Sequence, residues 1–334
     1  MRSRTSGVLL AVVLLAACDC ESTDDGPGTG GGGAEEQQRI VAVIPKGTTH
    51  EFWKSVHAGA NKAGRELGVE ILWQGPVRED DRSAQIDVVE GMITRGVVGI
   101  VLAPLDDTAL ARPAEEARRQ DIPVVIIDSG IQWDGRVSFV ATDNRRGGSL
   151  AAERLGELLG GTGKVLVMRY QEGSASTMER EAGFLETMAE SFPGVEIVSS
   201  NQYGGATTES AYQKAENLLV SFTDVQGIFT PNESTTFGML RALQDGGRAG
   251  EVKFVGFDSS EKLVEALRDG HIHGLVLQNP FRMGELGVRT LVAHLDGEAV
   301  EPRIDTGVTI ATRENMDEQE IRELLSPDLD RWLE

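Results

Sequence analysis

Residues 40–53 read IVAVIPKGTTHEFW, an apolar run followed by a polar turn and the start of a helical pattern. A continuous apolar run of this length is expected of a parallel strand that is covered on both faces. Thr49 is a start signal for the helix that follows it. The segment therefore predicts a buried β-strand that leads into an amphipathic α-helix.

The same alternation of strand and helix patterns continues along the chain. Further apolar runs predict strands at residues 69–73, 99–103, 124–128, 137–141, 164–168, 196–199, 227–230, 253–256 and 274–278. Helix starts are indicated by Asp81, Asp107, Asn144 and Thr177, and helix ends by Pro123 and Pro193. Repeated β-α-β units predict parallel sheets with right-handed crossovers.

The predicted strands are too many for a single sheet, and a length of 334 residues favours two domains. We therefore expect an α/β fold of two similar lobes. The N-terminal lobe would hold residues 39–142 and 279–306, and the C-terminal lobe residues 143–278. In a hinged two-lobe design, the helix at 281–295 and a final strand at 308–311 return to the first lobe. The sequence leaves open which lobe holds residues 307–334.

The first residues have the features of an export signal. Arg2 and Arg4 precede an apolar run over residues 7–17, which is too short for a membrane span of about 20 residues. The ending Leu-Ala-Ala-Cys resembles a bacterial lipobox. Residues 1–17 are therefore expected to be a lipoprotein signal peptide, after which Cys18 carries lipid. The alternative is a plain secreted protein with a chance cysteine.

Cysteine usage and charge extend this prediction. Cys20 is the only other cysteine, so no disulfide is expected if Cys18 is lipidated. Residues 18–38 offer little to bury and predict a flexible linker. The formal charge of -21 argues against a nucleic-acid partner, and solubility explains it more simply. We expect the chain in the periplasm or at the cell surface, lipid-anchored to the bacterial membrane.

Polar and aromatic side chains follow the predicted strands, where open parallel sheets bind ligands. The candidate site residues are Lys46, His50, Phe52, Trp53, Asp128, Thr142, Arg180, Asn232, Asp258 and Gln278. Aromatic rings can cover the apolar face of a sugar, while carboxylate, amide and guanidinium groups bond its hydroxyls. A buried polar group left unpaired costs about 1–3 kcal/mol, so such a site also rejects a wrong epimer. These residue types predict a sugar site that both halves of the chain form.

Four segments resemble the ribose-binding-protein family, the sugar-binding periplasmic components of bacterial ABC transporters. They are residues 44–60, Thr142-Asp143-Asn144, Val255-Gly256-Phe257-Asp258 and the asparagine after the Phe229 strand. The resemblance covers about residues 39–312. It implies a periplasmic binding protein type I fold, with two Rossmann-like lobes that three hinge strands join. It also implies a monomer that closes on its ligand and delivers it to an ABC transporter permease.

The resemblance implies positions for the individual site residues. First-lobe site positions are matched by His50, Phe52, Trp53 and Asp128. Hinge and second-lobe positions are matched by Thr142, Arg180, Asn232, Asp258 and Gln278. Each residue also has a structural alternative. The carboxylates and the asparagine could cap helices or turns, the arginine could be exposed on a helix, and the aromatic pair could be helix core.

The chain departs from the family's ribose binders at several positions. Those proteins have asparagine where His50 and Ala103 stand and arginine where Ser129 stands, which argues against ribose itself. The opening Ile44-Pro45-Lys46 is similar to the autoinducer-2-binding branch, in which the lysine contacts the ligand. That branch's aspartate–glutamine pair is not matched around Met178. The alternative function is therefore a sensory receptor for autoinducer-2 or a sugar, coupled to a membrane signalling partner.

Motifs of catalysis are not recognised in the sequence. We find no nucleophile elbow, phosphate loop, dinucleotide fingerprint or zinc-binding helix spacing. The five histidines are dispersed, and His271 and His273 alternate near a predicted turn, which does not indicate a metal site. We therefore expect a binding protein without cofactor or metal, and not an enzyme.

Overall fold

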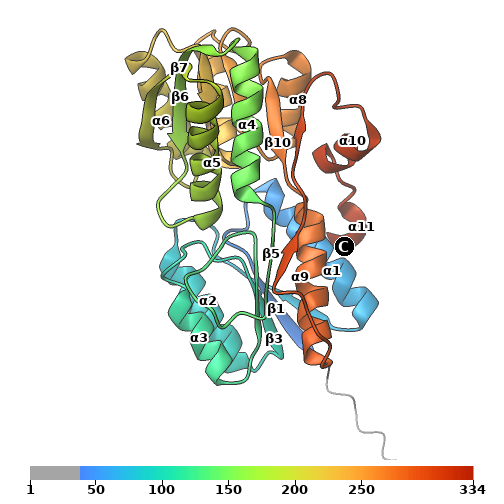
Figure 1. The fold of residues 1–334 in the computed structure, drawn as a ribbon. Coiled ribbons are helices and arrows are strands. Elements are labelled where there is room, and N and C mark those ends of the chain that lie inside the picture. Colours follow the sequence, from blue (N-terminus) through green and yellow to red (C-terminus); the bar gives the residue numbers. More distant parts are fainter. Residues whose placement is uncertain (1–37, 334) are drawn as a thin grey trace, which may run out of the picture. The chain divides into compact units, whose positions relative to one another are not determined.

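The computed structural model describes residues 38–333, in which two six-stranded sheets each form the centre of a lobe (Figure 1). The expected signal peptide, Cys18 and almost all of the expected linker lie outside these residues. The first sheet has the order β11-β5-β4-β3-β1-β2, and all its pairings are parallel. Its strands are β1 (Ile40–Ile44), β2 (Glu70–Trp73), β3 (Gly99–Leu102), β4 (Val124–Ile127), β5 (Ser138–Ala141) and β11 (Arg303–Asp305).

The second sheet repeats this arrangement in the order β12-β10-β9-β8-β6-β7. Its pairings are parallel except that β12 runs antiparallel to β10. Its strands are β6 (Thr162–Arg169), β7 (Gly194–Tyr203), β8 (Gly227–Phe229), β9 (Lys253–Phe257), β10 (Gly274–Leu277) and β12 (Thr309–Ala311). The expected α/β fold of two parallel-sheet lobes is confirmed.

Helices cover both faces of each sheet. Those on the first sheet are α1 (Glu51–Leu67), α2 (Arg82–Arg95), α3 (Ala111–Arg119) and α9 (Pro280–Leu295). Those on the second sheet are α4 (Asn144–Leu158), α5 (Ala175–Ser191), α6 (Thr208–Ser221), α7 (Glu233–Asp245), α8 (Glu261–Asp269) and α10 (Gln319–Leu325). The last helix, α11 (Asp330–Leu333), packs on α1 of the first lobe.

The continuous apolar run of β1 is explained by this double cover. Val41 and Val43 pack into one core with α1 and α9, whereas Ala42 and Ile44 pack into another with α2 and α3. Successive strand side chains point to opposite faces, so a strand covered on both sides needs apolar residues at every position. The burial of β1 from Val41 to Ile44 is thus specified by the apolar run itself, while Ile40 at the start of the strand is half-buried.

The chain passes between the lobes after β5, after β10 and after β11. The helix α9 returns to the first lobe and packs closely on α1, where a Cβ added to Gly59 would lie 1.9 Å from the carbonyl oxygen of Phe281. The expectation that the final strand also joins the first sheet is wrong, because β12 pairs with β10 in the second sheet. The short strand β11, which the sequence did not predict, occupies the first-sheet edge beside β5 instead.

Several helix starts differ from the sequence prediction. The third helix begins at Ala111 and not after Asp107, because the Asp106 carboxylate accepts hydrogen bonds from the backbone of Thr108 and Ala109 and holds a separate turn. The first helix has His50 rather than Thr49 at its N-cap. The fifth starts at Ala175, two residues before the expected Thr177. Asp81 caps the second helix as expected.

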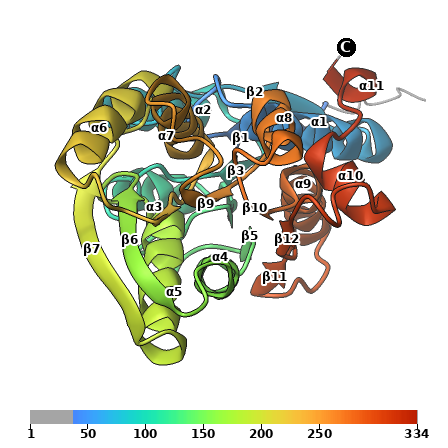
Figure 2. The same cartoon turned by 90° about the horizontal axis from the view of Figure 1, so that it is seen from above.

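The C-terminal segment, residues 312–333, runs from one lobe to the other. Ile321 and Leu325 of α10 belong to a core of the second lobe. Figures 1 and 2 both show α11 beside α1, and the side-chain amide of Asn61 on α1 donates to the carbonyl oxygen of Trp332 at 2.9 Å. This segment therefore adds a fourth link between the lobes.

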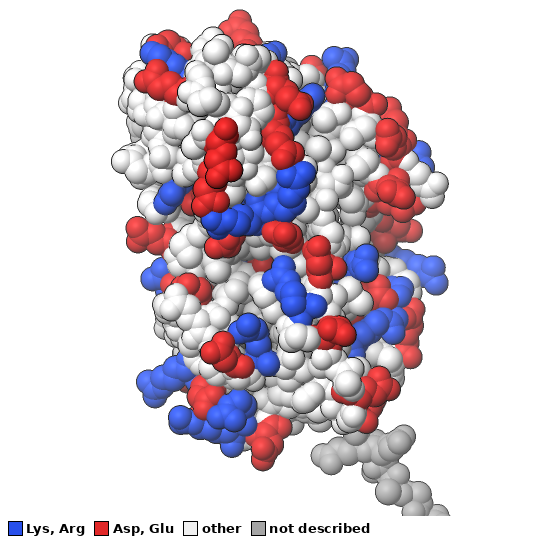
Figure 3. Space-filling view, viewed as in Figure 1, with Lys and Arg blue, Asp and Glu red and all other residues white. Residues whose placement is uncertain are grey.

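The surface carries both signs of charge. Acidic and basic side chains are interspersed over the face of the described residues seen in Figure 3, and several form ion pairs, such as Arg145 with Glu179 at 2.8 Å. Within residues 38–333, no helix is long and apolar enough to cross a membrane.

Candidate functional site

A cavity between the two lobes brings the predicted site residues together. It is lined by Lys46, His50, Phe52, Trp53, Glu79, Asp128, Tyr170, Ser174, Ser176, Thr177, Arg180, Asn232, Glu233, Asp258 and Gln278. Of the residues predicted from sequence, Thr142 alone is not in this lining. Its hydroxyl lies 3.3 Å from that of Thr306 and donates to the carbonyl oxygen of Gly307, both of which lie in a hinge crossing. The structure thus places Thr142 at the hinge and not in the cavity.

Two aspartates occupy matching places in the two lobes. Asp128 follows β4 and Asp258 follows β9, which are the third strands in their sheet orders. Both have left-handed backbone conformations, with φ of 61° and 69°. Aspartate tolerates this conformation better than most residues, but it still requires support from the surrounding structure. Both carboxylates are buried and face the same cavity from opposite lobes.

Arg180 on α5 lies between these carboxylates. Its Nη2 is 3.9 Å from Asp128 Oδ1, and its Nη1 is 4.0 Å from Asp258 Oδ2. The side chain is 2% exposed and its guanidinium stacks on Phe257, 4.1 Å from the ring centroid. Hydrogen bonds to Asn144 Oδ1 and the carbonyl oxygen of Pro231 fix its orientation. The predicted alternative, an exposed helical arginine, is thereby excluded.

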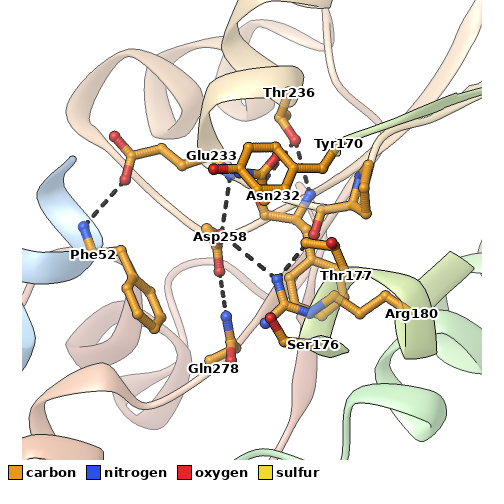
Figure 4. Close-up of polar contacts among 12 residues, drawn as sticks. Phe52, Tyr170, Ser176, Thr177, Arg180, Asn232, Glu233, Thr236, Asp258 and Gln278 are labelled. Carbon is orange, nitrogen blue, oxygen red and sulfur yellow. Dashed lines mark hydrogen bonds and ion pairs between the residues drawn. The ribbon is translucent and has the colours of Figure 1, made fainter. Parts of the chain in front are cut away.

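Asp258 is the centre of the polar contacts in Figure 4. Its Oδ1 accepts from Gln278 Nε2 at 2.7 Å, and its Oδ2 accepts from the backbone N–H of Glu233 at 3.0 Å. Burial raises the pKa of Asp258, against the opposing effect of the Arg180 guanidinium. The Oε1 of Gln278 is buried and has no hydrogen-bond partner among residues 38–333, so it can accept from a ligand.

Lys46, in the first lobe, contacts Asp128 of its own lobe and Ser176 of the other lobe. Its Nζ lies 2.7 Å from Asp128 Oδ2 and donates to Ser176 Oγ at 3.0 Å. The lysine is 3% exposed. Because Ser176 belongs to α5 in the second lobe, this ammonium group joins the lobes through the site.

A network around Glu79 was not predicted from the sequence. Its Oε1 lies 2.6 Å from His50 Nδ1 and accepts from Trp53 Nε1 at 2.5 Å, while its Oε2 accepts from the Tyr170 hydroxyl at 2.5 Å. The rings of Phe52 and Trp53 meet edge to face with centroids 4.8 Å apart. A signal was available, because Glu79 lies in the loop after β2 and the loops after strands carry the site.

Glu233 caps the first helix from the other lobe. Its carboxylate, at the start of α7, accepts from the backbone N–H groups of Glu51 and Phe52 at 3.2 and 3.1 Å. Figure 4 shows the contact with Phe52. A carboxylate at this position is favoured because a helix N-terminus has free N–H groups and a partial positive charge. Burial nevertheless raises the pKa of Glu233 to about 7. The helix that carries the aromatic pair is thus completed by a residue of the opposite lobe.

Asn232 has the structural role that the sequence offered as its alternative. It is the N-cap of α7, and its Oδ1 accepts from the hydroxyl of Thr235 at 2.6 Å and from the backbone N–H of the same residue at 3.4 Å. It also lines the cavity. Capping fixes its rotamer and leaves the side chain at the cavity wall.

The cavity is rich in hydrogen-bond acceptors. Four carboxylates line it, from Glu79, Asp128, Glu233 and Asp258, against three basic groups, from Lys46, His50 and Arg180. Such a set suits a ligand that donates many hydrogen bonds and presents an apolar face to aromatic rings. In the part of the chain that the structure describes, no cluster of three or more His, Cys, Asp or Glu could hold a metal ion. His273, singled out in the sequence, lies 3.3 Å from Lys253 Nζ and accepts from Phe254 N–H.

Comparison with known proteins identifies relatives of this chain. A family profile described as a periplasmic binding protein domain matches residues 41–299. A D-ribose/D-allose-binding protein of Pseudomonas aeruginosa is 30% identical over 315 residues, which cover 91% of this chain and 96% of that protein.

Two solved structures are also similar. A solute-binding protein of an ABC transporter from Agrobacterium vitis, with bound D-fucose, is 37% identical with a TM-score of 0.83, covering 86% of this chain and all of that one. A carbohydrate transporter solute-binding protein from Agrobacterium radiobacter, in complex with D-arabinose, is 32% identical with a TM-score of 0.84, covering 87% of this chain and all of that one.

Proposed function

Because the chain belongs to the periplasmic binding protein domain family, we propose that it captures a small sugar between its lobes and delivers it to an ABC transporter permease. The observation that carries the proposal is the interlobe cavity, in which aromatic rings and buried carboxylates from both lobes meet. The D-fucose and D-arabinose bound to similar structures, and the ribose and allose in the name of a relative, support this class of ligand.

The cavity offers both kinds of contact that a sugar needs. Phe52 and Trp53 present ring faces and edges to the apolar side of a sugar, while Asp128 and Asp258 accept from its hydroxyls. Arg180 and Lys46 hold these carboxylates at fixed positions, so the ligand meets a preorganised site. We propose that the site binds its ligand without converting it, because the relatives are named for binding and transport.

Hinge closure is the mechanism that we propose for capture. The lobes would divide at the crossings after β5, β10 and β11, with residues 39–142 and 279–306 in one and 143–278 in the other. Lys46 with Ser176, and Glu233 with the start of α1, are contacts between lobes. A ligand that touches both lobes favours the closed state by the free energy of contacts available only there.

We also propose that Cys18 carries lipid, which would hold the receptor near its permease. The sequence feature that supports this is the Leu-Ala-Ala-Cys ending after a short apolar run. In cells, Cys18→Ala is expected to release the protein from the membrane fraction, whereas Cys20→Ala is expected to leave it there. Equal release of both variants, or of neither, would contradict the assignment.

A thermal-shift screen of residues 39–334 tests the sugar proposal. The panel holds D-fucose, D-arabinose, D-ribose, D-allose, other pentoses and hexoses, and autoinducer-2. A ligand present at 100 times its Kd adds about 2.7 kcal/mol to the free energy of unfolding, which is a clear rise in Tm. A sugar that raises Tm supports the proposal. A folded sample whose Tm responds to no sugar would contradict it.

The panel includes autoinducer-2 because of Lys46. The sequence resemblance to the autoinducer-2-binding branch rests partly on this lysine, and its ammonium group lines the cavity. A shift with autoinducer-2 alone would move the proposal to a sensory receptor that acts on a membrane signalling partner.

A further inference from the structure

Glu79 joins side chains of the two lobes inside the site. It lies in the loop between β2 and α2 and is 6% exposed. Its carboxylate contacts His50 and Trp53 of the first lobe, and it also accepts from the Tyr170 hydroxyl of the second lobe. Its backbone carbonyl accepts from Gln171 Nε2 at 2.9 Å. One residue thus holds two first-lobe site residues and the end of β6 in the second lobe.

The local sequence makes room for this arrangement. A Cβ added to Gly47 would lie 2.7 Å from Glu79 Cγ, so the glycine after Lys46 lets the carboxylate reach the cavity. A buried carboxylate is stable only when its oxygens are paired, because loss of one partner leaves desolvated charge. The oxygen Oε2 bonds Tyr170, a partner from the opposite lobe, so lobe opening would break that bond.

Electrostatics support an ionised pair. Burial acts to lower the pKa of His50, but the Glu79 carboxylate outweighs it and raises this pKa to about 9. Burial acts to raise the pKa of Glu79, and His50 outweighs it and lowers this pKa to about 2. Other charges near His50 are Glu233 of α7 and Asp258 after β9, both carboxylates, while Lys46 acts on Glu79.

We propose that Glu79 is a positioning residue that links lobe closure to ligand recognition. It orients His50 and Trp53 for the ligand, and through Tyr170 it holds the second lobe over them. With Nδ1 of His50 directed at Glu79, the ring keeps its Nε2–H as a donor for a ligand oxygen. This role rests on the proposed function, but both experiments below are done without sugar, so their failure is distinguishable from failure to bind sugar.

The first experiment measures closure without ligand. Spin labels at Arg112→Cys on α3 and Val220→Cys on α6, both exposed, report the distance between lobes in a chain from Arg39 that has no other cysteine. In pulsed electron–electron double resonance, Tyr170→Phe and Glu79→Gln are each expected to shift the distance between the two labels to longer values than in the parent. Tyr212→Phe is the matched control, because among residues 38–333 its hydroxyl bonds only to Glu216 and Asp245 of its own lobe.

A Tyr170→Phe distribution identical to that of the Tyr212→Phe control would overturn the closing role. The second experiment titrates His50 by NMR of labelled histidine. Glu79→Gln is expected to lower the pKa of His50 by at least two pH units, whereas Tyr170→Phe should leave it near that of the parent. A role in packing alone would not move this titration, so an unchanged His50 pKa in Glu79→Gln would overturn the positioning role.

Discussion

Asp128 and Asp258 keep left-handed backbones at the matching strand ends of the two lobes. Such conformations cost free energy and persist where the surrounding structure enforces them. Here the enforcing contacts are the ion pair with Lys46 for Asp128 and the hydrogen bond from Gln278 for Asp258. The strain is thus located at the carboxylates that we assign to the ligand.

Asp128→Asn is expected to weaken sugar binding about 10- to 100-fold. The substitution keeps the shape and the tolerance of a positive φ, but it removes the charge that pairs with Lys46. A hydrogen bond to a charged group contributes about 1.5–3 kcal/mol, and about 1.4 kcal/mol corresponds to a factor of ten. Isothermal titration calorimetry with the most stabilising sugar of the screen measures the change.

Asp121→Asn is the matched control for this substitution. Asp121 also has a left-handed backbone, with φ of 58°, but it is exposed in the turn between α3 and β4. We expect it to bind sugar as the parent does. Equal affinities of the two variants would show that Asp128 does not contact the ligand.

The raised pKa of Glu233 predicts that lobe closure depends on pH. Burial raises its pKa from 4.5 to about 7 in the closed arrangement. Because this acid has a raised pKa, its contribution to closure is full below about pH 4.5 and is lost as the pH rises through 7. Sugar affinity is therefore expected to fall between pH 5 and 7.5. Burial opposes the effect, but the pair with Glu79 raises the pKa of His50 to about 9, so the contribution of His50 is also full at low pH and is lost as the pH rises through 9.

Glu233→Gln is expected to flatten this profile in calorimetric titrations across the same pH range. Glu261→Gln removes an exposed carboxylate from the same position of α8 and should keep the parental profile. If Glu233→Gln follows the parental slope, another group controls the pH response.

Most of the cavity lining was predictable at the level of residues. The rule that ligands bind after parallel strands located Lys46, Asp128 and Asp258 from sequence. The same rule points to the loop after β2, but nothing in that loop identifies Tyr170 as the partner of Glu79. Partners from different lobes are separated by 91 residues in this case, and local patterns carry no information on them.

At the scale of elements, close helix packing positions Arg180. A Cβ added to Gly148 on α4 would lie 1.9 Å from the carbonyl oxygen of Arg180 on α5. Gly148→Ala must therefore separate the two helices. We expect the free energy of unfolding to fall by about 1–3 kcal/mol, as for other overpacked cores, and sugar affinity to fall with it because Arg180 moves.

Denaturant unfolding, with Gly91→Ala as control, measures this effect. Gly91 lies within α2 and a Cβ there would meet nothing within 4 Å. Alanine is better than glycine in a helix by about 1 kcal/mol, so the control should be more stable than the parent. A Gly148→Ala protein as stable as this control would contradict the packing argument.

The C-terminal helix α11 is expected to limit lobe opening. Arg65 of α1 donates to the carbonyl oxygen of Arg331 at 2.9 Å and its guanidinium lies 5.7 Å from the Trp332 ring centroid, while Ile321 and Leu325 anchor α10 in the second lobe. Removal of residues 327–334 should increase the radius of gyration of the ligand-free chain in X-ray scattering. The free energy of unfolding should change little, since α11 contains no buried residue.

A single substitution separates the helix contact from the effect of truncation. Asn61→Ala removes the bond to Trp332, and Asn217→Ala removes an amide from α6 that makes no side-chain hydrogen bond in the described residues. We expect a larger radius of gyration only for Asn61→Ala. No change on truncation would mean that α11 does not restrain the lobes.

For the whole molecule, the alternation of apolar runs and helical patterns was enough to predict two parallel-sheet lobes. It failed where the chain crosses the hinge for the last time. The strand β11 spans only Arg303–Asp305 and has exposed charged ends, so it has no apolar run to recognise. Without it, the sequence did not show which lobe holds the final strand, and the antiparallel pairing of β12 with β10 follows from tertiary contacts alone.

The central claim is that a sugar binds between the lobes. Isothermal titration calorimetry of residues 39–334 tests this claim most directly. We would titrate D-fucose, D-arabinose, D-ribose and D-allose, the sugars named with similar proteins. The account predicts that at least one binds with a stoichiometry of one per chain. A folded chain that releases no heat with any of these sugars, at several temperatures, would contradict it.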